Sequence, residues 1–352
     1  MIPPGETIGI LGGGQLGRML AMAAAQLGYR CHIYAPEPDS IAAEVAAAFT
    51  CAAWDDTDAM ARFAADCAVV TYEFENVPVE PLGAIGATPL LPHPRALETA
   101  QDRLVEKRFC ESLGGTPAGY APVDSPAELA IAVARIGTPG ILKTRRDGYD
   151  GKGQWRIAAP GDIAALELPS RPLIYEALID FVAEFSVLLC RGADGDIRFW
   201  DTPQNVHKGG ILARSTVPAD ALAMAQVDEA RELASQIAAR LDYVGVMACE
   251  FFATAQGPVF NEMAPRVHNS GHWTIEGAVT SQFENHIRAI CGLPLGDTAL
   301  AAKRVEMRNI IGDAAESWPA ILSDPANHLH LYGKAAARPG RKMGHVTRLI
   351  LA

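Results

Sequence analysis

Two glutamates, Glu250 and Glu262, stand on either side of a short predicted hairpin. Its loop is expected to be the three residues 255–257, with glycine last, which is a favoured connection between antiparallel strands. With Thr254 paired to Pro258, the two glutamates face each other directly, their Cβ atoms about 5 Å apart. Like charges at that range repel, so either one carboxyl group is protonated or a cation lies between them. Magnesium, which prefers oxygen ligands and is often shared with substrate phosphates, fits best; an exposed pair on a solvated sheet face is the alternative.

A lone lysine, Lys143, lies near the end of the apolar segment 140–144, and a glycine-rich loop follows at 148–154. The loop holds three glycines with Lys152 among them, and its N–H groups could cover a polyphosphate. It is not a Walker A loop, because no G-x-x-x-x-G-K-[ST] pattern occurs in it. A hairpin tip with solvated charges is the alternative interpretation. Together with the paired glutamates, the lysine and a mobile glycine loop supply what binding of a nucleoside triphosphate requires.

A second glycine cluster, residues 12–17, matches G-x-G-x-x-G between a predicted strand, 7–11, and a predicted helix, 15–27. Glycines let the backbone approach an anion there, and the helix N-terminus supplies free N–H groups. A nicotinamide site also needs an acidic residue at the end of the second strand, but the predicted strand 29–34 is followed by Ala-Pro. Three interpretations stay open: another phosphate or ribose ligand, a structural turn, or an NAD(P) site.

The strands and helices that must position these groups are predicted to be of mixed α/β and α+β class. The opening alternates strands with helices, which is typical of an open parallel sheet. Helices are expected near 41–48 and 56–65, a buried strand at 69–72, and one helix at 95–113. The expected units are an N-terminal α/β domain, a connecting helix, a small mobile lid and a larger C-terminal α+β domain with a basic tail, at 1–94, 95–115, 116–180 and 181–352.

Composition excludes several classes of function. The chain has 352 residues, of which 49% are apolar and 20% charged, enough to bury a sizeable core. A formal net charge of −11 disfavours nucleic acid as a partner. Seven cysteines without a CxxC pair suit a reducing compartment. No basic leader precedes the first apolar run, and glycines interrupt that run, so we expect a cytoplasmic protein with no membrane partner.

Six segments together resemble the ATP-grasp enzymes, and among them the N5-carboxyaminoimidazole ribonucleotide synthetase family. They follow in order along nearly the whole chain, at 10–19, 72–77, 148–154, 205–207, 261–272 and 332–341. The resemblance implies an ATP-grasp fold with a Rossmann-like pre-ATP-grasp domain, a mobile lid and a large C-terminal domain. This family carboxylates 5-aminoimidazole ribonucleotide with ATP and bicarbonate in de novo purine biosynthesis. Bicarbonate is a poor electrophile, and phosphorylation to carboxyphosphate gives it a leaving group.

The resemblance makes ATP the co-substrate and Mg²⁺ the metal, held by Glu250 and Glu262. Lys143 would contact phosphate oxygens as a point charge, and Glu184 could accept both ribose hydroxyls. The stretch 176–179 would read the adenine edge at a hinge between lid and core. The implied ATP-binding residues are Arg103, Lys143, Gly148, Tyr149, Asp150, Gly151, Lys152, Gly153, Gln154, Glu176, Ala177, Leu178, Ile179, Glu184, His207, Asn261 and Glu262.

Bicarbonate would meet Arg266, His268 and Asn269, because an arginine fork with an imidazole and an amide suits a planar anion. Asp150 completes the expected catalytic set as the group that accepts a proton when the amine attacks; a turn-forming aspartate is the alternative. The acceptor nucleotide would bind Gly14, Gln15, Leu16, Glu73, Tyr149, Lys152, Lys334 and Arg341.

Lys334 and Arg341 belong to a segment, 334–352, with five basic residues and no acidic one. The resemblance makes them ligands of the acceptor's 5′-phosphate, and a solvated basic tail is the alternative. A homodimer with small-molecule substrates only is expected from the same family. The competing functions are a formate-dependent glycinamide ribonucleotide transformylase of the same superfamily, an NAD(P)-binding reductase, and a nucleotide sensor without catalysis.

Overall fold

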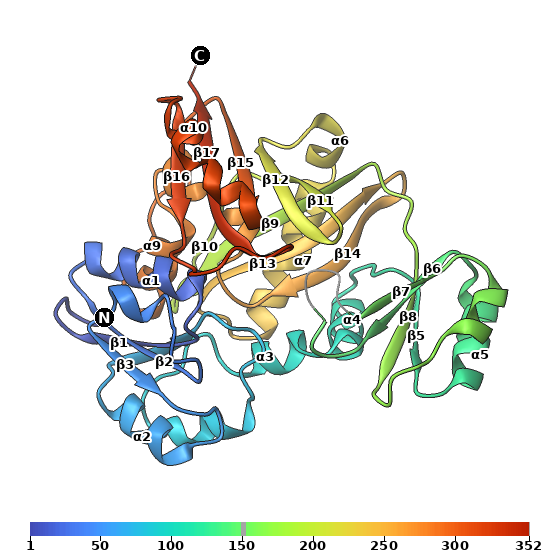
Figure 1. Ribbon diagram of the computed structural model, residues 1–352, viewed down its shortest axis with the longest axis horizontal. Coiled ribbons are helices and arrows are strands. Elements are labelled where there is room, and N and C mark those ends of the chain that lie inside the picture. Colours follow the sequence, from blue (N-terminus) through green and yellow to red (C-terminus); the bar gives the residue numbers. More distant parts are fainter. Residues whose placement is uncertain (149–152, 352) are drawn as a thin grey trace.

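The computed structural model describes residues 1–148 and 153–351, which form three β-sheets with helices packed around them (Figure 1). Two sheets have four strands and the third has nine. The expected class is confirmed: a parallel sheet near the N-terminus is followed by two antiparallel sheets with helices. In this described part of the chain, no helix combines the length and apolar character needed to cross a bilayer.

The N-terminal sheet is entirely parallel, with strand order β3-β2-β1-β4. Along the first strand, Ile8 and Ile10 pack in one core and Leu11 in another, because successive side chains point to opposite faces. The carboxyl ends of β1 and β4 lie side by side, and the crevice outside such strand ends is a usual ligand site. The elements are β1 (Thr7–Leu11), α1 (Gln15–Gln26), β2 (Arg30–Ala35), the 3₁₀ helix η1 (Ala43–Val45), β3 (Ala48–Cys51), α2 (Thr57–Ala65), β4 (Val69–Tyr72) and the 3₁₀ helix η2 (Glu80–Ile85).

The helix expected at 41–48 is wrong. Only the short η1 forms there, and the chain then enters β3, in which Ala48 pairs with His32 of β2. Alanine favours a helix locally. The open edge of β2, however, offers backbone hydrogen bonds to an extended segment, and this tertiary pairing overrides the local preference.

The helix expected at 95–113 is instead two helices, α3 (Arg95–Ala100) and α4 (Arg103–Ser112). Asp102 separates them, because its backbone is extended and its carboxylate accepts the N–H groups of Leu104 and Val105 as the N-cap of α4. The same carboxylate accepts a 2.7 Å hydrogen bond from Arg145 Nη2. Asp102 thus starts α4 and ties it to the chain that follows β6.

The second sheet, with order β5-β8-β6-β7, forms the small unit on the right of Figure 1. The buried residues of its core all lie between Ala121 and Tyr175, so this core is its own. The elements are β5 (Tyr120–Val123), α5 (Pro126–Ile136), β6 (Gly140–Thr144), β7 (Gln154–Ile157), the 3₁₀ helix η3 (Pro160–Ala165) and β8 (Leu173–Ala177).

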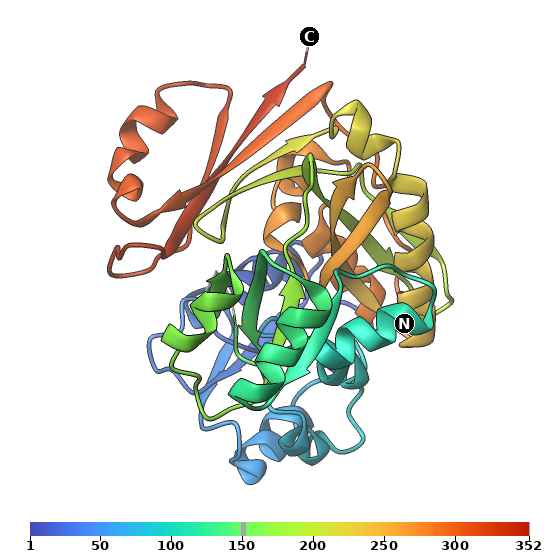
Figure 2. The ribbon, with the colours of Figure 1, turned by 90° about the vertical axis from the view of Figure 1, so that its right-hand side faces the viewer.

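The large sheet runs β14-β13-β9-β11-β12-β15-β17-β16, with β10 paired to β9. Figure 2 shows β15–β17 extending it away from the other two sheets. Its strands are β9 (Ala183–Arg191), β10 (Ile197–Phe199), β11 (Gln204–Lys208), β12 (Ile211–Val217), β13 (Gly245–Thr254), β14 (Gly257–Ala264), β15 (Arg304–Ile311), β16 (Asn327–Leu331) and β17 (Lys342–Ile350). The helices are α6 (Ala221–Met224), α7 (Val227–Arg240), η4 (Asn269–Gly271), α8 (Thr274–Gly277), α9 (Gln282–Ile290), η5 (Gly312–Ser317) and α10 (Trp318–Leu322).

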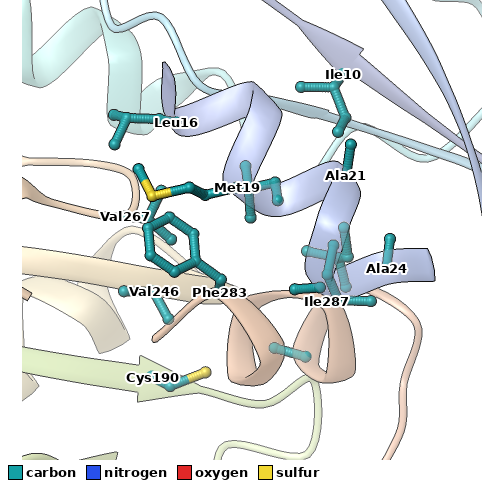
Figure 3. Packing of buried hydrophobic residues seen from close by; sticks show 14 of the residues in the cluster. Ile10, Leu16, Met19, Ala21, Ala24, Cys190, Val246, Val267, Phe283 and Ile287 are labelled. Atoms are coloured by element: carbon teal, nitrogen blue, oxygen red, sulfur yellow. The ribbon is translucent and has the colours of Figure 1, made fainter. Parts of the chain in front are cut away.

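One hydrophobic core joins the N-terminal sheet to the large sheet. In it, Leu16 and Met19 of α1 pack with Val267 and with Phe283 of α9 (Figure 3). The glycine loop before α1 and the segment after β14 are therefore fixed relative to each other by shared apolar burial. This arrangement brings the two sequence regions with predicted chemistry to one place.

Candidate active site

Glu250 of β13 and Glu262 of β14 pair directly across the two strands, as predicted. The predicted loop is wrong, because Thr254 pairs with Gly257 and only two residues lie between them. The Thr254 hydroxyl stabilises this tighter turn by donating to the Gly257 carbonyl at 2.8 Å. A β-bulge between Glu250 and Phe251 shifts the register by one residue and so restores the pairing of the glutamates.

The two carboxyl groups differ in electrostatic environment. Arg103 Nη1 lies 3.0 Å from Glu262 Oε2, and although burial opposes ionisation, this and other nearby cations hold the pKa of Glu262 below its ordinary value. Burial and the charge of Glu262 raise the pKa of Glu250 to about 7. Glu250 Oε1 also lies 3.6 Å from His268 Nε2. The pair therefore favours a state with one charge unless a further cation joins it.

The donor set of this pair fits magnesium. Within residues 1–148 and 153–351, no group of three or more His, Cys, Asp or Glu side chains is arranged to hold a metal ion by itself. Magnesium commonly takes only one or two carboxylates and completes its shell with substrate phosphate and water. Glu250 and Glu262 could therefore hold the ion jointly with a phosphate.

Lys143 is buried on β6, and its Nζ lies 2.8 Å from Glu176 Oε2 on the neighbouring β8. Burial lowers the pKa of Lys143, and Glu176 opposes that effect. Lys107 of α4 reaches the same Glu176 oxygen at 3.3 Å. Glu176 Oε1 is buried and has no partner within the described residues, so it can accept a hydrogen bond from a bound group.

A small pocket, partly open to solvent, lies between β9, β11 and the hairpin. Glu184 Oε2 contacts His207 Nδ1 at its edge. Burial opposes protonation of His207, but the hydrogen bond to Glu184 and the nearby carboxylates raise its pKa. The lining residues are Glu184, Phe185, Asn205, His207, Glu250, Phe251, Phe252 and Asn261.

In the segment after β14, hydrogen bonds hold the guanidinium group of Arg266 in place. Arg266 Nη2 donates a 2.6 Å hydrogen bond to Glu75 Oε2, and its Nη1 donates to the Val267 carbonyl at 3.0 Å. His268 Nδ1 lies 2.8 Å from the Ser270 hydroxyl, and burial together with Arg266 holds the pKa of His268 well below its ordinary value. Both polar side-chain atoms of Asn269 are buried without a partner among the described residues. Neutral His268 and unpaired Asn269 are suited to bind a small polar ligand.

The glycine cluster at residues 12–17 encloses the carboxylate of Glu73, which follows β4. The Gly14 N–H donates to Glu73 Oε1 at 2.7 Å. A Cβ atom at Gly12 would lie 2.6 Å from the same oxygen, and Gly12 has a φ of +116°, so this position requires glycine. Burial raises the pKa of Glu73, while the Gly14 N–H and the charges of Arg266 and Lys334 lower it. The cluster thus packs against an acidic group instead of presenting an open anion cradle at Gly14.

Lys334 lies close enough to Glu73 to act on its charge, whereas the hydrogen bond of Arg341 is to its own loop. Lys334 acts electrostatically on Glu73, and its Nζ donates to the Lys342 carbonyl at 2.8 Å. Arg341 Nη1 donates to the Ala336 carbonyl at 2.9 Å, within its own loop. Gln15 is the first residue of α1 and directly follows Gly14, whereas the side chain of Leu16 belongs to the core shared by the N-terminal and large sheets.

The chain matches family models along nearly its whole length. Residues 5–101 match the ribonucleotide synthetase preATP-grasp domain, 108–283 the ATP-grasp domain, and 306–350 the phosphoribosylaminoimidazole carboxylase C-terminal domain. An N5-carboxyaminoimidazole ribonucleotide synthase of Brucella melitensis is 49% identical over 99% of this chain and 97% of its own length. The chain belongs to the N5-carboxyaminoimidazole ribonucleotide synthase family. The resemblance inferred from its motifs is confirmed.

Solved structures of this family share the whole fold. The crystal structure of an ADP complex of an N5-carboxyaminoimidazole ribonucleotide synthetase matches with a TM-score of 0.93 at 40% identity, covering 99% of this chain and 93% of that one. An Aspergillus clavatus enzyme in complex with ADP and 5-aminoimidazole ribonucleotide matches with a TM-score of 0.90 at 32% identity, covering 99% and 94%. An ATP-grasp ligase of purine biosynthesis is therefore the class to which this chain belongs, and the NAD(P)-reductase interpretation has no counterpart in these relatives.

Four of the predicted site residues, Tyr149, Asp150, Gly151 and Lys152, lie outside the described residues. The loop around them is described at both ends. The Gly148 carbonyl accepts a 3.1 Å hydrogen bond from Arg103 Nη2, and Gln154 pairs with Lys143 at the start of β7. Gly153 has a φ of +67°, which favours glycine there. At the other end of the sheet, Ala177 ends β8 and precedes Leu178 and Ile179, the expected hinge.

Sequence reasoning missed two charged residues of this site, Lys107 and Glu75. Lys107 could have been noticed, because it lies four positions after Arg103 on a helix and so shares its face. Glu75 lies inside segment 72–77, which carries part of the family resemblance, but nothing in that segment indicates its partner. It lies in a loop after β4, and its partner Arg266 is 191 residues away in sequence.

Proposed function

We propose that this chain carboxylates 5-aminoimidazole ribonucleotide to N5-carboxyaminoimidazole ribonucleotide with ATP and bicarbonate, through carboxyphosphate. The observation that carries this proposal is the position of Arg266. The arginine lies two residues after β14, the strand that carries Glu262, and its Nη2 donates a 2.6 Å hydrogen bond to Glu75, which lies close to Glu73 in the loop after β4. Its positive charge also opposes the burial that raises the pKa values of Glu250 and Glu73. An arginine that joins these two segments is suited to bind bicarbonate between a phosphate-activating site and an acceptor site.

On the ATP side, this chain's residues neutralise and orient a polyphosphate. Glu250 and Glu262 would hold Mg²⁺, which supplies neutralisation of phosphate charge when it is bound. Arg103 and Lys143 would bind phosphate oxygens, and Glu184 with His207 would bind the ribose. The buried, unpartnered Glu176 Oε1 suits a donor such as the adenine amine.

On the acceptor side, Arg266, His268 and Asn269 would hold bicarbonate with one oxygen facing the γ-phosphate. That oxygen attacks phosphorus, and ADP leaves. Glu73 would then orient the exocyclic amine, which attacks the carboxyl carbon of carboxyphosphate while phosphate departs with the C–O bonding pair. The amine loses one proton in this step, and Asp150 remains our proposed acceptor for it.

Further features of the proposal rest on the family resemblance and on the sheets. We propose the domain division 1–94, 95–115, 116–180 and 181–352, since the small sheet from Tyr120 to Ala177 has its own core. We also propose a homodimer that works in the cytoplasm.

An ADP-release assay tests the proposed function. Bicarbonate, formate, 5-aminoimidazole ribonucleotide and glycinamide ribonucleotide are each added or left out in the presence of ATP and magnesium. Rapid ADP release is expected only when bicarbonate and the aminoimidazole nucleotide are both present. Release with formate and glycinamide ribonucleotide would indicate the transformylase, and nucleotide binding without any release would indicate a sensor.

The phosphate of the acceptor provides a second prediction. Lys334→Ala and Arg341→Ala should each weaken use of the aminoimidazole nucleotide by roughly 10- to 100-fold, because each removes a charge-assisted hydrogen bond. The KM for ATP should stay nearly constant, since that site is built from other segments. Steady-state kinetics with the two substrates varied separately measure this. A rise confined to the KM for ATP would show that neither residue binds the acceptor's phosphate.

A further inference from the structure

Lys107 is a buried cation that the proposed mechanism does not use. It lies on α4, and only 1% of its surface is exposed. Its Nζ lies 3.3 Å from Glu176 Oε2 on β8 and donates a 3.4 Å hydrogen bond to the Asn261 carbonyl on β14. One ammonium group therefore links helix α4, the small sheet and strand β14, which carries Glu262.

The groups around Lys107 carry more positive than negative charge. The ammonium groups of Lys107 and Lys143 both contact the single carboxylate of Glu176, whereas Arg103 has its own partner in Glu262. Two ammonium groups against one carboxylate leave one positive charge in excess. A buried excess charge costs free energy unless a ligand of opposite sign binds to it. The surroundings of Lys107 and Lys143 therefore favour binding of an anion.

The geometry at Glu176 explains how this excess is kept available. Both lysines contact the same carboxylate oxygen, Lys143 at 2.8 Å and Lys107 at 3.3 Å. Without Lys107, Glu176 and Lys143 would form an isolated neutral pair, and the Lys143 ammonium would lose part of its attraction for a phosphate.

We propose that Lys107 is a positioning residue that shares Glu176 with Lys143 and thereby keeps one positive charge in excess where the phosphates of an adenosine nucleotide bind. The proposal rests on the proposed ATP-dependent function and deepens it. Lys107 acts through Glu176 and Lys143 and has no contact with the nucleotide in this scheme. Its removal should therefore affect nucleotide binding much more than the later carboxyl transfer.

Lys107→Met tests the proposal. We expect its dissociation constant for ADP with magnesium, measured by calorimetry, and its KM for ATP to rise about 10- to 100-fold. The KM for the aminoimidazole nucleotide and kcat at saturating ATP should change little. Lys107→Arg, which keeps the charge, should restore most of the affinity. Arg108→Met is the matched control, because it removes an exposed charge from the next position of the same helix.

The alternatives give different results. A merely structural lysine predicts that Lys107→Met lowers the melting temperature and kcat while ADP affinity is retained, and that result would overturn the proposal. An arginine variant as weak as the methionine variant would also overturn it. If Lys107→Met does not fold, Lys107→Gln, which keeps a donor for the Asn261 carbonyl, replaces it with the same expected loss. Failure of the unaltered protein to bind ADP would contradict the proposed function instead.

Discussion

Replacing Glu262 with glutamine is expected to slow the ATP-dependent reaction by about 100- to 1000-fold at saturating magnesium. The substitution keeps the shape of the side chain and removes the negative charge that faces Glu250 across the hairpin. A single carboxylate would then hold the metal ion, and phosphate charge in the transition state would be poorly neutralised. The magnesium concentration for half-maximal rate should also rise, and ADP release at varied magnesium measures both effects.

The matched control for this prediction is Glu229→Gln. Glu229 is exposed on α7 and lies beside the tip of the same hairpin, where its Oε2 is 3.6 Å from a Cβ atom placed at Gly257. It carries the same charge but is far along the strands from the paired glutamates. Its rate should match that of the unaltered enzyme. Undiminished turnover by Glu262→Gln would remove Glu262 from the set of metal ligands.

Local pattern was sufficient for much of the fold. The strand-glycine-helix start was predicted to within a residue or two, because a continuous apolar strand buried on both faces and the glycine-rich turn after it are encoded locally. The failures required information from elsewhere. β3 exists because β2 has a free edge, and α3 ends because Asp102 caps the next helix and binds Arg145.

The paired glutamates show how a correct prediction can rest on a wrong detail. The expected three-residue loop and the observed two-residue turn differ by one position in register. The bulge at Glu250 and Phe251 cancels that difference. The bulge has a physical reason on β14, because Phe260 lies in the buried core and Glu262 faces Glu250, although residues two apart share one face of a regular strand. The sequence shows both residues but not which of them a bulge would turn.

The partners of residues that act over long sequence distances could not be predicted. Glu75 fixes one side of Arg266, and Lys107 shares Glu176 with Lys143, but only the packing of three sheets brings these groups together. His286 of α9 is a further example, because its buried ring bonds Val246 of the large sheet and Thr71 of the N-terminal sheet.

His286 should make the stability of this protein fall in acid. Its Nδ1 accepts the Val246 N–H at 3.1 Å, so its Nε2 carries the hydrogen and donates to the Thr71 hydroxyl at 2.9 Å. One neutral imidazole therefore joins β13 of the large sheet to β4 of the N-terminal sheet. Burial lowers the pKa of His286 to about 3, because a protonated ring could not be solvated there and would confront the Val246 N–H with a second donor.

The direction of the pH effect follows from comparing the folded and unfolded chains. Above pH 6.5 the histidine is mainly neutral in both, so it adds no pH dependence. As pH falls below 6.5, the unfolded chain binds a proton that the folded protein rejects until the pH nears 3, and the free energy of unfolding decreases. The loss is about 1.4 kcal/mol per pH unit, or about 2 to 3 kcal/mol between pH 6.5 and 4.5.

Other groups titrate in the same range, so the measurement compares variants at each pH. Burial raises the pKa of Glu106 to about 8, which favours the folded state as pH falls and opposes the histidine effect in the unaltered protein.

His286→Asn keeps an acceptor for the Val246 N–H but cannot titrate. It should be less stable than the unaltered protein at pH 7, and that deficit should shrink by about 2 to 3 kcal/mol by pH 4.5 in denaturant unfolding. His328→Asn, at an exposed position of β16, corrects for the loss of a histidine as such. A deficit for His286→Asn that stays constant across this range would mean that His286 accepts a proton in the folded protein as readily as in the unfolded chain, and the bridge between the two sheets would then not depend on a neutral ring.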